Sequence, residues 1–470
     1  MLVLKFGGTS VANAQAILQI AAVLKEKAYP RNMVVVVSAM SGVTDMLISC
    51  YQKAAGHDAS YHEVIQQLET KHMEAIEQLI PFSYQIDVKG KVKLLLRELE
   101  DICQGVFLLD ELSDGIKARI MSYGELLSSS IVSVAFNHQD LPNTLIDSRD
   151  YIVTDNNYLN AKVDQKKTFA LIKDRMADAA LTIAPGFISR TDTGKTSVLG
   201  RGGSDYTASI YAAALDAERL EIWSDVDGMY TADPRKVKAA HPINELSYKE
   251  AMELAYFGAK VLYPPTIAPL VAAQIPLMLK NTFNPSHKGT LITASPATGQ
   301  NSIKGVSCID NIALITLSGS GMVGVPGIAM RMFKAVATQN INIYFITQSS
   351  SEQSITIAMA DQEGQPALQA LTKEFAQDIE ANDVDPVSLE PHMSIVAIVG
   401  NGMIQQPGIA GTMFSILGSH SINIRAIAQG ATERNISIVV RGEDAVRSVN
   451  LLHDSFFLVK KDKQAEALAS

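Results

Sequence analysis

The stretch LVLKFGGTSV, Leu2 to Val11, joins a short apolar run to a lysine, two adjacent glycines and two hydroxyl residues. An apolar run that ends in a turn is typical of a buried strand. Glycines after a strand let the backbone approach a ligand closely, and N–H groups beside a lysine favour an anion. We interpret Lys5, Gly7 and Gly8 as part of a phosphate-binding loop. A tight turn beside an exposed lysine explains the stretch equally well when it is considered alone.

Further apolar runs follow this first one, separated by amphipathic stretches. They are MVVVVSAM at 33–40, ALTIAPGFI at 180–188, RLEIWSDV at 219–226 and IPLMLKNT at 275–282. Continuous rather than alternating apolarity is typical of strands that are covered on both faces. The sequence therefore predicts an α/β domain over residues 1–295, with a mostly parallel open sheet sandwiched by helices.

Composition limits the classes of function. The chain has 470 residues, of which 47% are hydrophobic, so at least two domains are expected. The formal net charge is -9, and no run of Lys and Arg is long enough to bind a nucleic-acid backbone. Neither a signal peptide nor a membrane-spanning run is present, which predicts a cytoplasmic protein. The histidines and the three cysteines show no metal-ligand spacing, so no protein metal site is expected.

The C-terminal part contains a duplicated unit. Residues 325–359 align with 406–440 at one constant offset of 81 positions, as between Pro326 and Pro407. Each copy is interpreted as strand, Pro-Gly turn, helix, two strands and helix, which predicts an α+β module; the resemblance described below implies the ferredoxin-like type. The expected domains are 303–390 and 391–470. An exchange in which the C-terminal helix and strand complete the first module is left open.

A second glycine loop occurs in LGRGGSDYTA, residues 199–208. Arg201 offers two parallel donors to a carboxylate, and Asp205 can orient a lysine or a magnesium ligand. Ser204 and Asp205 also suit an ordinary helix cap, which is the commoner role of such a pair. Two glycine loops in one domain nevertheless suggest phosphoryl transfer between two substrates.

Three further motifs are individually weak. Glu125 in SYGELLS can bind an ammonium group, although a glutamate in the first turn of a helix is also simply favourable. The stretch IWSDVDGMYTADPRKV, residues 222–237, follows a strand at the place where α/β sheets bind nucleotides, but its Asp-Gly and Asp-Pro pairs are also plain turn residues. Lys260 follows a helix that starts with a capping box and could reach phosphates; alone it would more often be a solvated lysine.

Two familiar patterns are rejected. GSGMVG, residues 319–324, matches the dinucleotide-binding pattern, but the second repeat lacks its third glycine and the next strand does not end in the acid that a ribose needs. TGKTS, residues 193–197, resembles half of a phosphate loop without the earlier glycine, so we interpret it as a hairpin tip.

Taken together, the motifs KFGGTSV, SYGE, GRGGSDYTA, SDVDGMYTADPR and FGAKVLYP closely resemble aspartate kinase of the amino-acid kinase superfamily. The duplicated unit resembles tandem ACT domains, and FITQSSSE and IAQGATER are most similar to the threonine-responsive class. That class is often fused to homoserine dehydrogenase, a domain not expected in this sequence. The resemblance implies that ATP phosphorylates the side-chain carboxylate of L-aspartate, with Mg²⁺ as the accompanying ion.

The resemblance also implies roles for individual residues. It assigns catalysis to Lys5, Asp205 and Lys260; aspartate binding to Ser38, Thr44, Glu125, Arg201 and Ser204; and nucleotide or phosphoryl binding to Gly7, Gly8, Thr9, Ser10, Ser224, Asp225, Tyr230, Arg235 and Lys260. Two positions depart from the commonest pattern. Ser224 replaces a threonine and keeps the hydroxyl, whereas Tyr263 replaces a histidine near Lys260.

For regulation, the resemblance implies feedback by an end-product amino acid, with threonine expected ahead of lysine. The effector-binding residues would be Gln348, Gln429, Asn342 and Asn423, although both glutamines could simply finish strands. Pairing of ACT domains implies a homodimer or a higher homo-oligomer. The alternatives are a kinase for another small carboxylate, a sensor that has lost catalysis, and a nicotinamide oxidoreductase, which would depend only on the rejected GSGMVG loop.

Overall fold

The computed structural model describes residues 1–26, 29, 32–176, 180–257, 262–296 and 302–458. They form two compact units, which are considered separately. The N-terminal unit contains Met1–Met229, Pro242–Ala251 and residues 262–296. The C-terminal unit contains Tyr230–His241, a short stretch from Met252, and residues 302–458. None of the described helices is both long and apolar enough to cross a membrane.

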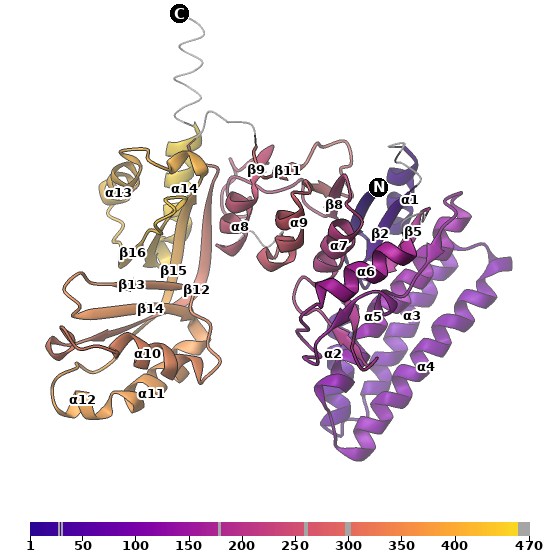
Figure 1. Ribbon diagram of the computed structural model, residues 1–470, viewed down its shortest axis with the longest axis horizontal. Coiled ribbons are helices and arrows are strands. Elements are labelled where there is room, and N and C mark those ends of the chain that lie inside the picture. Colours follow the sequence, from indigo (N-terminus) through magenta and orange to yellow (C-terminus); the bar gives the residue numbers. More distant parts are fainter. Residues whose placement is uncertain (27–28, 30–31, 177–179, 258–261, 297–301, 459–470) are drawn as a thin grey trace, which may run out of the picture. The chain divides into compact units, whose positions relative to one another are not determined.

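An eight-stranded sheet forms the centre of the N-terminal unit (Figure 1). Its strands are β1 Leu2–Phe6, β2 Met33–Val37, β3 Thr144–Leu145, β5 Thr182–Pro185, β8 Arg219–Ser224, β9 Glu245–Ser247, β10 Leu277–Asn281 and β11 Thr290–Thr293. They lie in the order β3-β5-β2-β1-β8-β10-β11-β9, and every neighbouring pair except β10–β11 is parallel. The predicted mostly parallel sheet is confirmed, and β1 and β2 are buried along their whole length.

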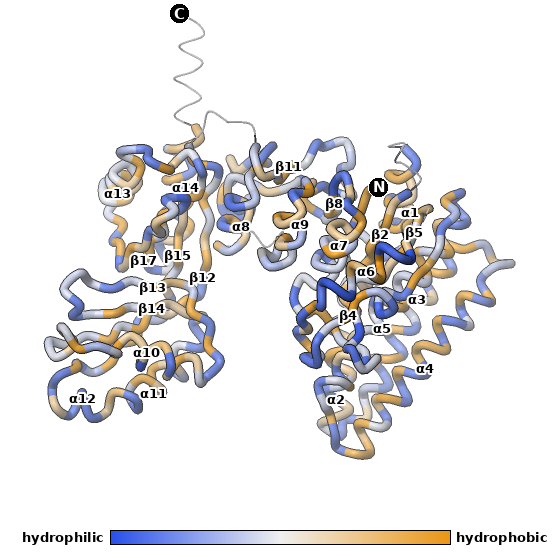
Figure 2. Tube along the Cα trace, in the orientation of Figure 1, coloured by the Kyte–Doolittle hydropathy of each residue, from blue (hydrophilic) through white to orange (hydrophobic). Residues whose placement is uncertain are grey.

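Helices cover both faces of this sheet. They are α1 Ala14–Glu26, α2 Val43–Ala55, α3 Tyr61–Leu79, α4 Gln85–Leu109, α5 Asp114–His138, α6 Gln165–Met176, α7 Gly203–Ala214, α8 Tyr248–Tyr256 and α9 Ala268–Ala273. Leu4 and Phe6 of β1 belong to one core with residues of α1 to α5. Because side chains alternate along a strand, Lys5 between them points to the opposite face, where α7 packs. Figure 2 shows α4 as a mixture of hydrophilic and hydrophobic residues, as expected for an amphipathic helix.

A small second sheet lies in the N-terminal unit and contains β4 Val153–Thr154, β6 Ile188–Thr191 and β7 Thr196–Val198. Strands β6 and β7 are antiparallel, and Gly194 between them has a φ of 82°, which favours glycine. The interpretation of TGKTS as a hairpin tip is confirmed.

The C-terminal unit contains one antiparallel sheet of six strands in the order β13-β14-β12-β15-β17-β16. The strands are β12 Gly305–Ser318, β13 Phe345–Gln348, β14 Ser354–Ala360, β15 Ser388–Val399, β16 Ala426–Ala428 and β17 Asn435–Arg441. The helices are α10 Ile328–Ala337, α11 Gly364–Glu374, α12 Ala376–Glu380, α13 Ile409–Ser419 and α14 Gly442–His453. Two separate cores, one for each repeat, lie between the sheet and these helices.

A segment that precedes the first repeat contributes to the second module, whereas the sequence left open that the C-terminal helix and strand complete the first module. Helix α14 packs in the core of the second module, through Val449 and Leu452, and not in that of the first. Instead, residues that precede the first repeat, Ile303 and Val306, complete the second core. The reason is the length of β12, because its first half pairs with the end of β15 and its second half pairs with the start of β15.

Candidate active site

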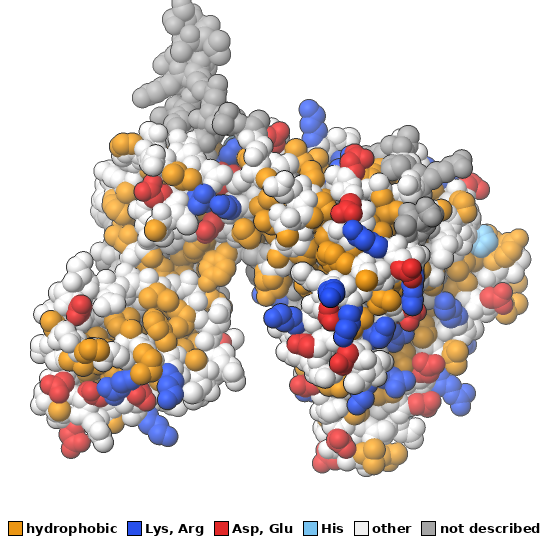
Figure 3. All heavy atoms as spheres, in the orientation of Figure 1, with side chains coloured by type: hydrophobic (Ala, Val, Ile, Leu, Met, Phe, Trp, Pro, Cys, Tyr) orange, Lys and Arg blue, Asp and Glu red, His pale blue; other side chains and the backbone are white. Residues whose placement is uncertain are grey.

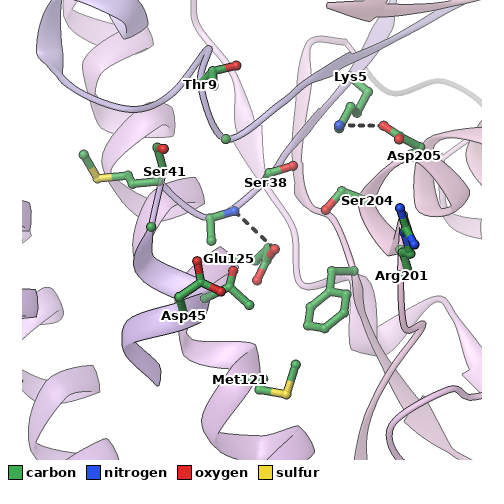
Figure 4. Close-up of a pocket in the computed structure, with 18 of the residues that line it drawn as sticks. Lys5, Thr9, Ser38, Ser41, Asp45, Met121, Glu125, Arg201, Ser204 and Asp205 are labelled. Atoms are coloured by element: carbon green, nitrogen blue, oxygen red, sulfur yellow. Dashed lines mark hydrogen bonds and ion pairs between the residues drawn. The ribbon is translucent and has the colours of Figure 1, made fainter. Parts of the chain in front are cut away.

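A cavity of about 610 Å³ lies at the carboxyl ends of β1 and β2, where α/β sheets usually bind ligands (Figure 4). The glycine loop after β1, the loop after β2, helix α5 and the turn before α7 contribute its walls. Its lining includes nine residues that the sequence assigned to catalysis or binding: Lys5, Gly8, Thr9, Ser38, Thr44, Glu125, Arg201, Ser204 and Asp205. Four segments that are separated in the sequence therefore meet around one space.

Lys5 and Asp205 form an ion pair at one side of the cavity. Lys5 Nζ lies 2.5 Å from Asp205 Oδ1, and their side chains are 11% and 14% exposed. Asp205 belongs to the first turn of α7, so the ion pair links the first glycine loop to the second. Asp205 can therefore hold Lys5 in place while the ammonium group of Lys5 still faces the cavity.

Only part of the first glycine loop reaches the cavity. Gly8 and Thr9 line it, and a Cβ at Gly8 would lie 3.1 Å from the carbonyl oxygen of Ala39. The N–H of Gly7 instead donates to the carbonyl of Trp223. The hydroxyl of Ser10 is buried and hydrogen-bonded with that of Thr282. Gly7 and Ser10 therefore shape the loop, and the expectation that they contact phosphate is not supported by these bonds.

Glu125 is the most unusual carboxylate in the cavity. It lies in the middle of α5 and not, as the sequence suggested, in the first turn of a helix; the missing side chain of Gly124 beside it allows α5 to approach Ala39. Glu125 Oε1 accepts a hydrogen bond from the N–H of Ala39 at 3.2 Å, whereas Oε2 is buried without a hydrogen-bond partner among the described residues. Burial raises the pKa of Glu125 to about 8, against the opposing effects of the Ala39 N–H and the charge of Lys5. A ligand ammonium group would satisfy the unpaired oxygen.

Arg201 faces the same cavity from a tight turn. The turn is made by Gly200 and Gly202, which have φ values of 71° and 68°. A Cβ at Gly202 would lie 2.9 Å from the Cβ of Tyr263, and the Arg201 guanidinium lies 5.7 Å from the Tyr263 ring centroid. Tyr263, whose effect the sequence could not indicate, therefore packs against the turn that carries Arg201.

The residues that the resemblance assigns to nucleotide binding do not all line one cavity. Asp225 lines a second hollow of about 570 Å³ together with Thr9 and the exposed ring of Phe283. Tyr230 and Arg235 belong to the C-terminal unit, and Lys260 lies outside the described residues. Ser224 is the last residue of β8, and Asp225 directly follows it.

Sequence reasoning missed several residues of the cavity. Met40, Ser41, Asp45, Met121 and Phe187 also line it. Asp45 and Ser41 lie within a motif that already supplied Ser38 and Thr44, so their closeness in sequence was an available signal. Met121 and Phe187 are apolar and carry no recognisable pattern.

The effector residues show a mixed outcome. Gln348 lines a hollow of about 310 Å³ in the first module, beside the Pro326-Gly327 turn and Glu352. Gln429 is exposed at the corresponding place in the second module. Asn342 and Asn423 are exposed and belong to none of the hollows described above.

The fold and the cavity are typical of an α/β unit that phosphorylates small molecules, followed in the chain by two regulatory modules. Residues 1–281 match the model of the amino acid kinase family, and residues 315–375 and 396–456 match an ACT domain model. Lysine-sensitive aspartokinase 3 of Escherichia coli is 31% identical over 97% of this chain and 99% of its own. The chain belongs to the aspartokinases of the amino acid kinase family.

Other relatives are longer. The bifunctional aspartokinase/homoserine dehydrogenase of Buchnera aphidicola is 35% identical over 98% of this chain, which spans 57% of that relative. Among solved structures, E. coli aspartokinase III in complex with aspartate and ADP has a TM-score of 0.82 at 30% identity, covering 97% of this chain and 100% of that one. The same enzyme in complex with lysine and aspartate has a TM-score of 0.78 at 31% identity, with coverages of 97% and 99%.

Proposed function

We propose that this chain is an aspartate kinase that transfers the γ-phosphoryl group of ATP to the side-chain carboxylate of L-aspartate. The observation that carries the proposal is the cavity that the Lys5–Asp205 ion pair shares with Arg201 and with Glu125, whose Oε2 has no hydrogen-bond partner among the described residues. The Lys5 ammonium group can bind a phosphoryl group. The buried Glu125 carboxylate can bind the ammonium group of an amino acid, and the Arg201 guanidinium can bind its α-carboxylate.

In the proposed reaction Glu125 binds the α-ammonium group of aspartate and Arg201 binds its α-carboxylate. The side-chain carboxylate is then free to attack the γ-phosphorus, and it is already ionised at neutral pH. One carboxylate oxygen forms a bond to phosphorus as the bond to the β,γ-bridging oxygen breaks, and ADP leaves with the electron pair. No proton transfer is needed, so the residues act by positioning and by charge. Lys5 opposes the negative charge of the transferred group.

ATP is proposed to bring Mg²⁺ with it. The described residues contain no group of three or more His, Cys, Asp or Glu side chains placed to hold a metal ion. This fits Mg²⁺, which keeps several waters and takes ligands mainly from substrate phosphates. Asp205 and Asp45 are the carboxylates of the cavity that could add a ligand, and the ion would neutralise phosphate charge.

For regulation, we propose that threonine, in preference to lysine, is the effector and that it binds at Gln348 and Gln429. The support is that Gln348 lines a hollow in the first module and that its amide can both donate and accept hydrogen bonds. A homodimer formed through the ACT modules and a cytoplasmic location are parts of the same proposal.

The test is the rate of ADP release from Mg-ATP with L-aspartate, with L-glutamate and without either, followed by trapping of the acyl phosphate with hydroxylamine. We expect turnover and hydroxamate only with aspartate, and a lower rate at saturating threonine. Turnover with another carboxylate would overturn the substrate, and no turnover at all would favour the sensor hypothesis. Inhibition by lysine but not threonine would overturn only the effector.

A further inference from the structure

The loop that follows β8 is divided between the two compact units. Ser224 and Asp225 belong to the N-terminal unit, whereas residues 230–237, which we call the nucleotide segment, belong to the C-terminal unit. The segment contains Tyr230 and Arg235, both assigned to nucleotide binding in the proposed function. Its conformation therefore depends on the contacts that it makes with the regulatory modules.

The first of these contacts is a hydroxyl anchor between Thr231 and His453. Thr231 Oγ1 lies 2.9 Å from His453 Nε2, and the two residues are 3% and 0% exposed. The same oxygen accepts from the N–H of His241, and the carbonyl of Thr231 accepts from the N–H of Val306 at 2.8 Å. His453 ends α14, and Val306 belongs to β12, so both partners are parts of the second module.

The second contact is an ion-pair anchor between Lys236 and Asp310. Lys236 Nζ lies 2.5 Å from Asp310 Oδ2, and the Lys236 side chain is 18% exposed. The carbonyl of Lys236 accepts a hydrogen bond from the side chain of Asn450 on α14 at 3.0 Å. Backbone and side chain of this one residue are therefore held by two different elements of the second module.

Apolar packing lies between the two anchors. Ala232 and Val237 are 4% and 1% exposed and belong to the core of the second module, with Val449 and Leu452 of α14. Arg235 stays at the surface, where its guanidinium is held by Asp233 at 2.7 Å and its side chain is 80% exposed. The segment thus buries its small and apolar residues in the regulatory module and leaves the arginine accessible to a ligand.

We propose that the second ACT module positions the nucleotide segment through the hydroxyl anchor and the ion-pair anchor. Thr231 and Lys236 belong to the segment and His453 contacts it, so we assign these three residues a positioning role. The inference depends on the proposed function, because it takes Tyr230 and Arg235 as nucleotide-binding groups. It adds residues that neither the motifs nor the family resemblance assigned.

The test uses the full-length protein and the variants Lys236→Met and Thr231→Val. Loss of either anchor should raise the KM for ATP and the Kd for Mg-ADP about tenfold, because a displaced segment binds less favourably. The KM for aspartate should stay within about twofold, since the aspartate cavity is built from the N-terminal unit. Lys236→Arg keeps the charge and should restore most of the ATP affinity.

Arg425→Met is the matched control, because it removes an ion pair of similar length with Glu390 in the same unit without touching the segment. Its ATP affinity should be that of the unmodified protein. Equal losses for Lys236→Met and Arg425→Met, or a parallel rise in the KM values for ATP and aspartate, would overturn the positioning role. Arg235→Met separates the two proposals. If Arg235→Met leaves the affinity for ATP unchanged, the assignment of Arg235 to nucleotide binding fails. If Arg235→Met weakens ATP binding but Lys236→Met and Thr231→Val do not, only the positioning role fails.

Discussion

Glutamates stand beside glycine-containing loops in both units of this protein, but their bonding differs. Glu125 in the kinase cavity is buried and has one oxygen without a partner among the described residues. In the regulatory modules Glu352 accepts from the N–H of Gly324 at 3.0 Å, and Glu433 accepts from that of Gln405 at 2.6 Å. Glu352 and Glu433 therefore hold the conformation of their loops, whereas Glu125 keeps one carboxylate oxygen without a hydrogen-bond partner among the described residues. A buried carboxylate oxygen without a hydrogen-bond partner is costly unless a ligand binds to it, so the comparison supports the proposal that the cavity binds the substrate.

The cavity also contains the charge whose loss should have the largest effect. Lys5→Met removes the ammonium group that we propose faces the transferred phosphoryl group, and we expect kcat to fall about a thousandfold. The measurement is ADP release at saturating ATP and aspartate. Lys53→Met, which breaks the surface ion pair with Asp58, is the control and should retain full activity. A Lys5→Met enzyme with a tenth of the original kcat would show that the ion pair is structural only.

Glu125 should have the next largest effect, and it is specific to one substrate. Glu125→Gln keeps the shape but removes the charge that would pair with the ammonium group of aspartate. We expect kcat/KM for aspartate to fall about a hundredfold, as for a lost charge-assisted hydrogen bond, with little change in the KM for ATP. Glu98→Gln, which alters a glutamate bonded to Tyr123 outside this cavity, is the control. An equal loss for both substrates would contradict the assignment.

The raised pKa of Glu125 gives a further prediction for the unmodified protein. With a pKa of about 8, the free carboxyl group is about three-quarters protonated at pH 7.5. An ammonium ligand favours the ionised form, so the pKa falls in the complex and aspartate binding releases a proton. The apparent affinity should therefore rise about tenfold per pH unit up to pH 8 and level off above it.

Calorimetric titration with aspartate in two buffers of different ionisation heat, at pH 7.5 and at pH 8.5, measures this release directly. The heats should differ between buffers at both pH values, and the difference at pH 8.5 should be about a third of that at pH 7.5, because the free carboxyl group is then only about one-quarter protonated. Equal heats at pH 7.5 would show that Glu125 is already ionised before the ligand binds.

The contrast between the units also separates what sequence reasoning can and cannot reach. Lys5, Glu125 and Arg201 could be predicted because each lies in a short contiguous motif, and the parallel sheet because its strands are continuous apolar runs. The entry of Ile303 and Val306 into the second module could not, because pairing along β12 and β15 leaves no local periodicity. The hydrogen bond from the Gly7 N–H to the carbonyl of Trp223 could not be predicted either, because sequence gives residue types and not the direction of an N–H group.

The smallest expected effects distinguish the two regulatory modules from each other. Gln348 lines a hollow, whereas Gln429 lines none of the hollows described above, and the second module also holds the nucleotide segment in its core. If threonine binds at Gln348, Gln348→Ala should raise the concentration for half-inhibition about fivefold, as for the loss of one or two hydrogen bonds, and leave the uninhibited rate unchanged. Gln429→Ala should have a smaller effect. Threonine titrations of the ADP-release rate measure both variants, with Gln339→Ala at the end of α10 as the control. Unchanged half-inhibition in both would remove the glutamines from the effector site, and a larger shift in Gln429→Ala would reverse the order of the modules.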